Sequence, residues 1–413
     1  MTTFGDQSTR REFIGKSTLA VVVGTLAASA GSSVAAEPAK AAGRPIERKI
    51  KLGLIGCGGR GTWLAKLFLQ HGGYEITAVA DYYPDLADRA GETFGVDKAR
   101  RFSGLGGHKR LLASGVEAVT VVNVPRFHAE HGHAAVEAGC HVYAAKPVAI
   151  DVPRALKVHA AGKLATQKKL CYLVDYQMPT DPINIEVVRR VHEGGLGRLM
   201  HVDSVGFSPP WAERPCPNPE DRLRQGRWLA TIALSGDVIT ENTIHSINAV
   251  LWLVGKRPTS AIGRTRVARE HPHDDFREVY LITYEFDDGL LWTHRCQSLR
   301  NQLDWDLHLN AYGDKATALV GYRDKSYLRG GPKHFGGGKI ESLYDQGAIR
   351  NIATFYRSII EGRCENLSVP QAGDDALTAV LGREAAARRT CLTMEELLKE
   401  NRELPFDLSG FKV

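Results

Sequence analysis

Over residues 50–168, short apolar runs alternate with segments whose apolar side chains recur at helical spacing. The runs are rich in Val, Ile and Ala without polar alternation, which is typical of strands buried on both faces. They are found at residues 50–55, 76–80, 118–124 and 141–144. The segments with helical spacing include residues 62–70, 129–138 and 152–168. This alternation predicts an α/β domain over residues 48–168, built on a parallel sheet covered by helices.

The pattern changes in the second half of the chain, where apolar and polar residues alternate with a period of two. Such alternation predicts mostly antiparallel strands with one covered face, at 201–207, 279–286, 290–296, 307–312 and 316–321. A strand at 170–174 opens this half, and helical spacing recurs at 183–193, 238–254, 348–361 and 374–390. The glycine-rich residues 330–338 predict a long loop. We therefore expect residues 169–413 to form an α+β domain with a large, mostly antiparallel open sheet.

Residues 1–47 fit neither pattern. Arg10 and Arg11 precede a mildly apolar stretch, and residues 34–36 supply small side chains at cleavage positions. This order predicts a twin-arginine signal peptide over residues 1–36 and a linker over residues 37–47. The stretch is too short and too rich in Gly, Ala and Ser to span a membrane stably. We expect export in folded form to the periplasm or another extracytoplasmic space; a tail with a chance arginine pair is the alternative.

Composition narrows the class of protein. The 413 residues suffice for two domains, and 43% hydrophobic with 24% charged residues is typical of a soluble globular protein. The net charge of +6 is spread along the chain without a dense Lys/Arg run, which argues against a nucleic-acid partner. No Cys-x-x-Cys or Cys/His metal spacing occurs among the 7 cysteines, so we expect no metal. Most cysteines should be buried apolar residues, with one disulfide as the alternative in an exported protein.

A glycine-rich turn follows the first predicted strand. Gly56, Gly58 and Gly61 occupy the glycine positions of a G-x-G-x-x-G motif, with Gly59 and Arg60 between the last two. In this motif the glycines allow a tight turn, backbone approach to a pyrophosphate, and close packing of helix and strand. A helical segment follows, so its N-terminus can face the phosphates.

An acidic side chain ends the second predicted strand. Asp81 lies 20 residues after Gly61, where a carboxylate accepts hydrogen bonds from the adenosine ribose and repels a 2′-phosphate. Strand, turn, helix and acid together predict a Rossmann domain that binds NAD in preference to NADP. A chance glycine loop is the alternative.

Further residues carry a resemblance to a known family. Asn123 and Pro125 with His128, and the strand 141–144 leading into Lys146 and Pro147, resemble the signature of the Gfo/Idh/MocA oxidoreductases. The twin-arginine pattern and the Gly-Gly-Arg-Gly turn are similar to exported members, which include NAD-dependent glycosidases. The resemblance covers the chain from about residue 50 to its last helices. It implies that Gly59, Arg60, Asn123, Pro125, His128 and Lys146 contact the cofactor.

One position departs from the family pattern. Ala145 stands where the family has a glutamate before the lysine, so a mechanism that needs this carboxylate is in doubt. The resemblance places Lys146 beside the nicotinamide and the reacting hydroxyl. There an ammonium stabilises a developing alkoxide and lowers the pKa of a nearby base.

The resemblance also implies an acid–base cluster in the second domain. Glu241 and His245 are four residues apart, on one face of the predicted helix 238–254, and Asn248 follows. His245 is the candidate general acid or base, because imidazole suits hydroxyl deprotonation near neutral pH. Glu241 would bind substrate hydroxyls or tune His245, and Tyr176 lies at a strand end that faces the active site in the family. A capped helix with a satisfied histidine is the alternative.

Several aromatic and polar residues suit carbohydrate binding, because they stack on sugar faces or grip hydroxyls. The candidates are Trp211, Arg227, Trp228, Asn242 and His334. Surface or oligomer loops are the alternative for the Trp/Arg segments.

Three functions follow from these features. The preferred one is an exported NAD-dependent oxidoreductase that transfers a hydride from a sugar, polyol or glycoside. The second is a redox-neutral glycoside hydrolase or lyase that acts through a transient keto-sugar. The third is a non-catalytic NAD- or sugar-binding protein. We also expect a homo-oligomer, either a dimer or a tetramer, because the open sheet needs cover.

Overall fold

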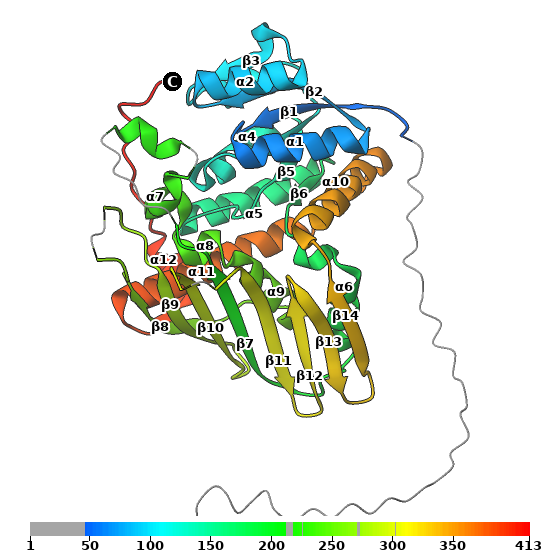
Figure 1. Cartoon of the computed structure of the whole chain (residues 1–413), viewed down its shortest axis with the longest axis vertical. Coiled ribbons are helices and arrows are strands. Elements are labelled where there is room, and N and C mark those ends of the chain that lie inside the picture. The colour runs from blue at the N-terminus through cyan, green and yellow to red at the C-terminus, as the bar shows by residue number, and fades with distance from the viewer. Residues whose placement is uncertain (1–45, 212–217, 225, 271–272, 302) are drawn as a thin grey trace, which may run out of the picture. The chain divides into compact units, whose positions relative to one another are not determined.

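A six-stranded parallel sheet occupies the upper half of the molecule in Figure 1. The computed structural model describes residues 46–413 except 212–217, 225, 271–272 and 302, and the predicted signal peptide and linker lie almost entirely outside this part. The strand order is β3-β2-β1-β4-β5-β6. The strands are β1 (Ile50–Ile55), β2 (Tyr74–Asp81), β3 (Arg101–Ser103), β4 (Ala118–Val121), β5 (His141–Ala144) and β6 (Tyr172–Val174). The predicted Rossmann-type sheet is confirmed.

Helices cover both faces of this sheet, which explains its uninterrupted apolar runs. Ile50, Leu52 and Leu54 of β1 pack with Phe68 and Phe355, which lie on helices on one side. Alternate strand residues pack into the core on the other side. The helices of this half are α1 (Gly59–His71), α2 (Pro84–Phe94), α3 (Gly107–Leu112), α4 (His128–Glu137) and α5 (Val152–Gln167). They are joined by α10 (Leu343–Glu361), which returns from the second half of the chain to pack on α1.

The last strand of the parallel sheet lies beyond the expected boundary at residue 168. In β6, Tyr172 pairs with Val142 of β5, and Val174 pairs with Ala144. The strand predicted at 170–174 therefore belongs to the first sheet and not to the second domain. Sequence could not decide this, because an apolar strand fits either sheet until its neighbour is known.

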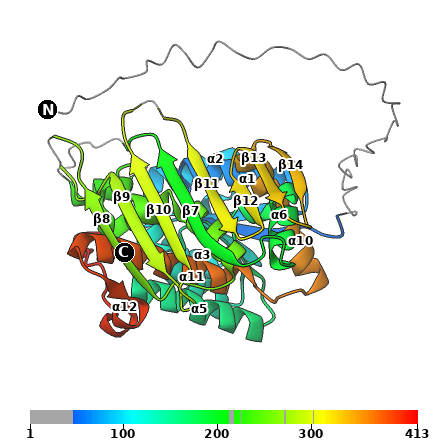
Figure 2. The same ribbon diagram turned by 90° about the horizontal axis from the view of Figure 1, so that it is seen from below.

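The second sheet has nine strands and is mostly antiparallel, as predicted (Figure 2). Its order is β14-β13-β12-β11-β7-β10-β9-β8-β15, and only β7 and β10 pair in parallel. The strands are β7 (Leu199–Ser208), β8 (Ser260–Arg266), β9 (Val279–Glu285), β10 (Leu291–Ser298), β11 (Asp306–Gly313), β12 (Ala316–Gly321), β13 (Asp324–Gly330), β14 (Phe335–Ile340) and β15 (Leu392–Thr393). Buried and exposed residues alternate along β9 and β10, so one face of the sheet is covered and the other is open.

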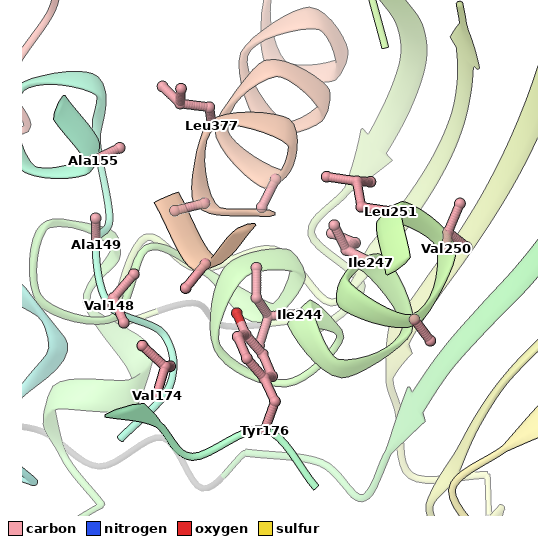
Figure 3. Packing of buried hydrophobic residues seen from close by; sticks show 14 of the residues in the cluster. Val148, Ala149, Ala155, Val174, Tyr176, Ile244, Ile247, Val250, Leu251 and Leu377 are labelled. Atoms are coloured by element: carbon pink, nitrogen blue, oxygen red, sulfur yellow. The ribbon is translucent and has the colours of Figure 1, made fainter. Parts of the chain in front are cut away.

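Helix α11 (Ser368–Arg388) lies between the two sheets (Figure 1). Of its 21 residues, 14 are buried, which is typical of a helix surrounded by protein on all sides. It contacts α5 and β6 of the first half and β8, β9 and α9 (Ile244–Val254) of the second. Figure 3 shows Leu377 of α11 in the same cluster as Ala155 and Ile247. The two sheets therefore share one hydrophobic core, and residues 46–413 form one compact unit.

Two predicted elements differ in the structure. The helix predicted at 238–254 is divided into α8 (Val238–Glu241) and α9, with a turn at Asn242 and Thr243. Thr243 Oγ1 donates to Ile239 O at 3.0 Å and lies 2.9 Å from Nε2 of buried His294. A hydroxyl that bonds the carbonyl four residues back competes with the helix and bends it.

The glycine-rich residues 330–338 form a hairpin between β13 and β14, and not a long loop. Strand β14 lies at the sheet edge, where a Cβ on Gly338 would be 2.9 Å from Ile183. The glycine thus permits close packing on α6 (Pro182–His192).

The described cysteines have free thiols, and four of them are buried: Cys57, Cys140, Cys171 and Cys296. Cys171 and Cys364 lie with their Sγ atoms 3.3 Å apart, and Cys216 lies outside the described residues. Short helices complete the fold: α7 (Ile232–Ser235) and α12 (Met394–Glu400). No helix within the described ranges is long and apolar enough to cross a membrane.

Candidate active site

A cleft with a volume of about 1410 Å³ lies at the carboxyl ends of the parallel strands. This is where parallel sheets bind ligands, and the volume exceeds the roughly 300–1,000 Å³ of a typical small-ligand pocket. One wall comes from the residues that follow β1, β2, β4, β5 and β6. The other comes from the second sheet and from α8 and α9. The cleft therefore joins both halves of the chain.

The glycine turn has the geometry that the motif predicts. Gly56 has φ +103°, and a Cβ there would lie 2.6 Å from Asn123 N. A methyl group on Gly61 would overlap the carbonyl oxygen of Gly56. Gly61 therefore lies against the turn and not in the cleft.

By contrast, a Cβ on Gly58 would meet no atom within 4 Å. Gly58 is the N-cap of α1, and it lines the cleft together with Gly56 and Gly59. The first-turn N–H groups of a helix have no partner within the helix and attract phosphate. An open cradle at this helix end fits a pyrophosphate, so the residues present fit a dinucleotide.

Asp81 lies at the end of β2 and lines the cleft. Its oxygens accept hydrogen bonds from Cys57 N at 2.8 Å and Tyr83 N at 3.0 Å, which fix the carboxyl group beside the glycine turn. Burial raises the pKa of Asp81. Each oxygen keeps a lone pair, so the group can also accept from ribose hydroxyls.

The loop after β4 also reaches the cleft, as the family resemblance implies. Asn123, Pro125 and His128 line the cavity. The buried His128 ring contacts Pro147 O at 2.7 Å and Asn123 O at 2.8 Å. His128 thereby ties this loop to the loop that carries Lys146.

Lys146 follows β5 and forms an ion pair with Glu241. Its Nζ donates to Glu241 O at 2.6 Å and to Oε1 at 3.1 Å. Lys146 therefore has a carboxylate partner in Glu241, although Ala145 stands at the position where the family has a glutamate. The chain supplies the acid from the end of α8 and not from the position before the lysine.

Asn242 extends this pair into a chain of contacts. In the amide orientation that satisfies both ends, its oxygen accepts from Trp211 Nε1 at 2.9 Å and Ser208 Oγ at 2.6 Å. Its nitrogen then donates to Glu241. Trp211, Asn242, Glu241 and Lys146 therefore form one connected wall of the cleft. The structure thus places the predicted substrate residues Trp211 and Asn242 at the cleft, and their contact with a substrate stays a prediction.

His245 lies in the first turn of α9 and lines the cleft, with only 7% of its surface exposed. The helix break at Asn242 and Thr243 does not separate it from Glu241, since both face the cavity. Its ring is 5.3 Å from the Tyr322 ring and 6.0 Å from the Tyr176 ring. Burial lowers its pKa well below 6.5, and Lys146 and Arg60 lower it further. His245 is therefore a neutral imidazole that can accept a proton.

Tyr176 lies in the hydrophobic core and does not line the cleft (Figure 3). Its neighbours Asp175 and Gln177 line the cavity instead. The chain turns directly after β6, where Tyr176 N donates to Val174 O at 2.8 Å, and Tyr176 enters the core while its two neighbours face the cleft. The sequence pattern identified the correct strand end and selected the wrong face.

Asp175, the first residue after β6, has a role in the site that the sequence did not indicate. This buried carboxylate accepts from Arg60 Nη2 at 2.6 Å, Tyr143 Oη at 2.8 Å and Asn351 Nδ2 at 3.0 Å. Arg60 Cζ packs on the rings of both Trp63 and Tyr344, 4.3 and 4.6 Å from their centroids, and these two rings contact each other. Arg60 is thus fixed at the cleft wall by its ion pair and by two aromatic rings.

The remaining substrate candidates divide into two groups. Trp228 lines the cleft, whereas Arg227 and His334 do not. His334 lies in the β13–β14 hairpin, and its carbonyl accepts from Arg190 of α6 at 2.8 Å. Within the described ranges, no three His, Cys, Asp or Glu side chains are arranged to hold a metal ion.

Two family models match the chain. The oxidoreductase family with an NAD-binding Rossmann fold matches residues 50–176, and the GFO/IDH/MocA C-terminal domain matches residues 185–319. Together they span more than half of the chain. The protein belongs to the Gfo/Idh/MocA oxidoreductase family. It is an oxidoreductase of this family, with an NAD-binding Rossmann domain.

The individual relatives of this protein have low sequence identity to it. It is 32% identical over 206 residues to the myo-inositol dehydrogenase Hyg17 of Streptomyces leeuwenhoekii, covering 49% of this chain but only 55% of that protein. It is 22% identical to an inositol 2-dehydrogenase of Rhizobium meliloti, covering 82% of this chain and 96% of the relative. A glycosyl hydrolase family 109 protein of Shewanella pealeana is 25% identical, covering 48% and 45%.

Among solved structures, a levoglucosan dehydrogenase in complex with NADH and levoglucosan has a TM-score of 0.68. It is 18% identical, and the match covers 84% of this chain and all of that one. At this identity the match supports the fold alone.

Proposed function

We propose that the protein oxidises a hydroxyl group of a sugar, polyol or glycoside by hydride transfer to tightly bound NAD. One observation supports this most strongly. Lys146, Glu241 and the uncharged His245 meet in the same cleft as the glycine turn. The names of the inositol and levoglucosan dehydrogenases point to the same substrate class.

Each side chain of the cleft has a separate role in this oxidation. Bound NAD would supply the hydride acceptor. His245 accepts the hydroxyl proton as the carbonyl forms. Lys146 donates a hydrogen bond to the same substrate oxygen and stabilises its negative charge. Glu241 holds the ammonium in place, and Trp211 lines the cleft as an aromatic ring on which a sugar can stack.

The pH dependence follows from His245. Because its neutral form is active and its pKa lies well below 6.5, lowering the pH should leave kcat/KM unchanged until the pH is below 6.5. The activity should then fall as the imidazole gains a proton. A kcat/KM profile measured from mildly acidic to neutral pH checks this. An acidic limb that is already complete above pH 6.5 would assign the base to another group.

The direct test is a panel of polyols, monosaccharides and glycosides, including myo-inositol and levoglucosan. With added NAD, the expected result is NADH formation with at least one member of the panel. The absence of NADH and of substrate turnover across the panel would contradict the proposal and favour a non-catalytic binding protein.

A redox-neutral glycoside hydrolase or lyase is the second candidate, supported by the similarity to the glycosyl hydrolase family 109 protein. In that case a glycoside is cleaved and NADH does not accumulate, because the hydride returns. A second measurement denatures the purified protein and quantifies the released NAD(H), which shows how much cofactor the protein retains. Near-stoichiometric NAD fits tight binding in both candidates, so the second candidate is favoured only if a glycoside is cleaved while no NADH accumulates. An empty protein that binds NAD weakly favours an exchangeable cofactor.

Export and oligomerisation are further parts of the proposal. The Arg10–Arg11 pattern supports export by the twin-arginine route in folded form. The open face of the second sheet carries Ile262, Leu281 and Leu291, which are 46–54% exposed. Apolar side chains on an open sheet support a homo-oligomer.

A further inference from the structure

Residues 403–413 cross the edge of the cofactor cleft as a segment without helix or strand, which we call the strap; it turns at residues 409–410, where Phe411 N donates to Leu408 O at 3.0 Å. Leu404, Phe406 and Leu408 alternate with exposed residues, and Phe411 is buried, with 7% of its surface exposed. An extended chain that presents every second side chain to the protein packs as an edge element does. The alternation shows that residues 403–408 of the strap are docked on the protein, and the turn that follows buries Phe411.

The first part of the strap is anchored by buried charges. Glu403 Oε1 accepts from Arg154 Nη2 at 2.9 Å, and Leu404 N donates to buried Asp151 at 3.0 Å. Arg126 Nη1 donates to Leu404 O at 2.7 Å. These contacts fix Glu403 and Leu404 as part of the fold.

The second part of the strap rests on the turn after β2 and the loop after β3. The Phe411 ring is 5.6 Å from the Tyr82 ring. Lys412 N donates to Tyr82 Oη at 3.2 Å, and Leu105 N donates to Lys412 O at 2.8 Å. The strap therefore bridges two loops that lie just beyond Asp81.

The position of these loops identifies what the strap covers. A dinucleotide whose pyrophosphate lies on the glycine turn and whose ribose lies on Asp81 has its adenine beyond Asp81. The cleft lining there includes Tyr82, Leu105 and, from the strap, Leu408. Leu223 and Trp228 line the cleft as well and pack in the same apolar cluster as Phe411.

We propose that the strap closes the adenine end of the NAD site and sets the rate at which the cofactor leaves. For the adenine end to exit, Leu408 and Phe411 must leave their apolar cluster, which exposes apolar surface to water. The strap stabilises the bound state without contacting the reacting centre, so it acts on cofactor retention and not on hydride transfer. The inference requires NAD binding only and does not depend on the substrate.

The experiment measures NADH dissociation from the folded protein by a stopped-flow chase with excess NAD. One variant ends the chain after Leu404, which keeps the anchored part and removes residues 405–413. A second is Phe411→Ala in the full chain. Both should release NADH at least about tenfold faster than the unaltered protein, because changes in affinity appear mostly in the dissociation rate.

The control variant is Ser409→Ala, which alters an exposed strap side chain and should leave the release rate unchanged. Circular dichroism and thermal unfolding establish that each variant is folded. Release rates equal to that of the unaltered protein in the shortened variant would overturn the proposal. If the shortened variant does not fold, Phe411→Ala decides in the same way. Faster NADH release from a variant that still binds NAD points to the strap. A damaged glycine turn would instead abolish NAD binding.

Discussion

Replacing either His245 or Lys146 by alanine should abolish turnover while NAD remains bound. For His245→Ala, the loss removes the group that accepts the hydroxyl proton, and such groups contribute roughly 10²–10⁴-fold to the rate. For Lys146→Ala, the loss removes the ammonium that stabilises the developing charge, and leaves Glu241 in the cleft without its cationic partner. Neither side chain belongs to the glycine turn or to Asp81, so the phosphate and ribose contacts persist.

The measurement is kcat on the best substrate of the panel, together with NAD binding by calorimetry. His334→Ala is the matched control, because the structure places this histidine in the β13–β14 hairpin outside the cleft. It should keep full turnover. Unchanged turnover in both cleft variants would remove His245 and Lys146 from the catalytic machinery, and loss of turnover in His334→Ala would return that residue to the site.

A pair of glycine substitutions should separate folding from cofactor binding. In Gly61→Ala the new methyl group meets the carbonyl oxygen of Gly56, and overpacking of this kind costs about 1–3 kcal/mol of stability. The backbone fixes the position of both the new Cβ and the Gly56 carbonyl oxygen, so the overlap cannot be relieved by a side-chain rotation. We expect a lower unfolding temperature and loss of NAD binding together.

In Gly58→Ala the methyl group meets no protein atom, and the backbone angles, φ −72° and ψ −171°, are accessible to alanine. Stability should change by at most about 1 kcal/mol, the scale of an N-cap substitution. The methyl group would instead occupy the space that a pyrophosphate needs, and we expect at least about tenfold weaker NAD binding. Thermal unfolding and calorimetry on both variants check the pair. Equal NAD affinity in Gly58→Ala and the unaltered chain would contradict the inference that the pyrophosphate lies at Gly58.

Local chemistry made part of the site predictable from sequence. The segment from Gly56 to Asp81 is only 26 residues long. The glycines are required by the backbone geometry of the turn, and Asp81 ends a strand at the edge of the sheet where dinucleotides bind. The family resemblance carried Lys146 and His245. The parallel and antiparallel halves followed from continuous and alternating apolar patterns, because burial on two faces or on one determines those patterns.

Contacts between residues far apart in the chain could not be predicted from the sequence. The partner of Lys146 is Glu241, 95 residues away, and no spacing rule links them. Helical periodicity continued through Thr243, where a buried hydrogen bond to Ile239 and contact with His294 break the helix. The alternation of Leu404, Phe406 and Leu408 is visible in the sequence, but only the structure shows the surface that it covers.

Helix α11 has a consequence for how the protein moves. In many two-domain enzymes, ligands enter and leave as rigid domains rotate about a hinge, and such motion needs an interface that can open. Here α11 is buried on both sides, and Val369 packs so closely on α5 that a Cβ on Gly162 would lie 2.8 Å from it. Rotation of the two sheets would pull apart a continuous core. We therefore expect exchange of cofactor and substrate through local displacement of surface segments, on the timescale of loop motion and not of domain rotation.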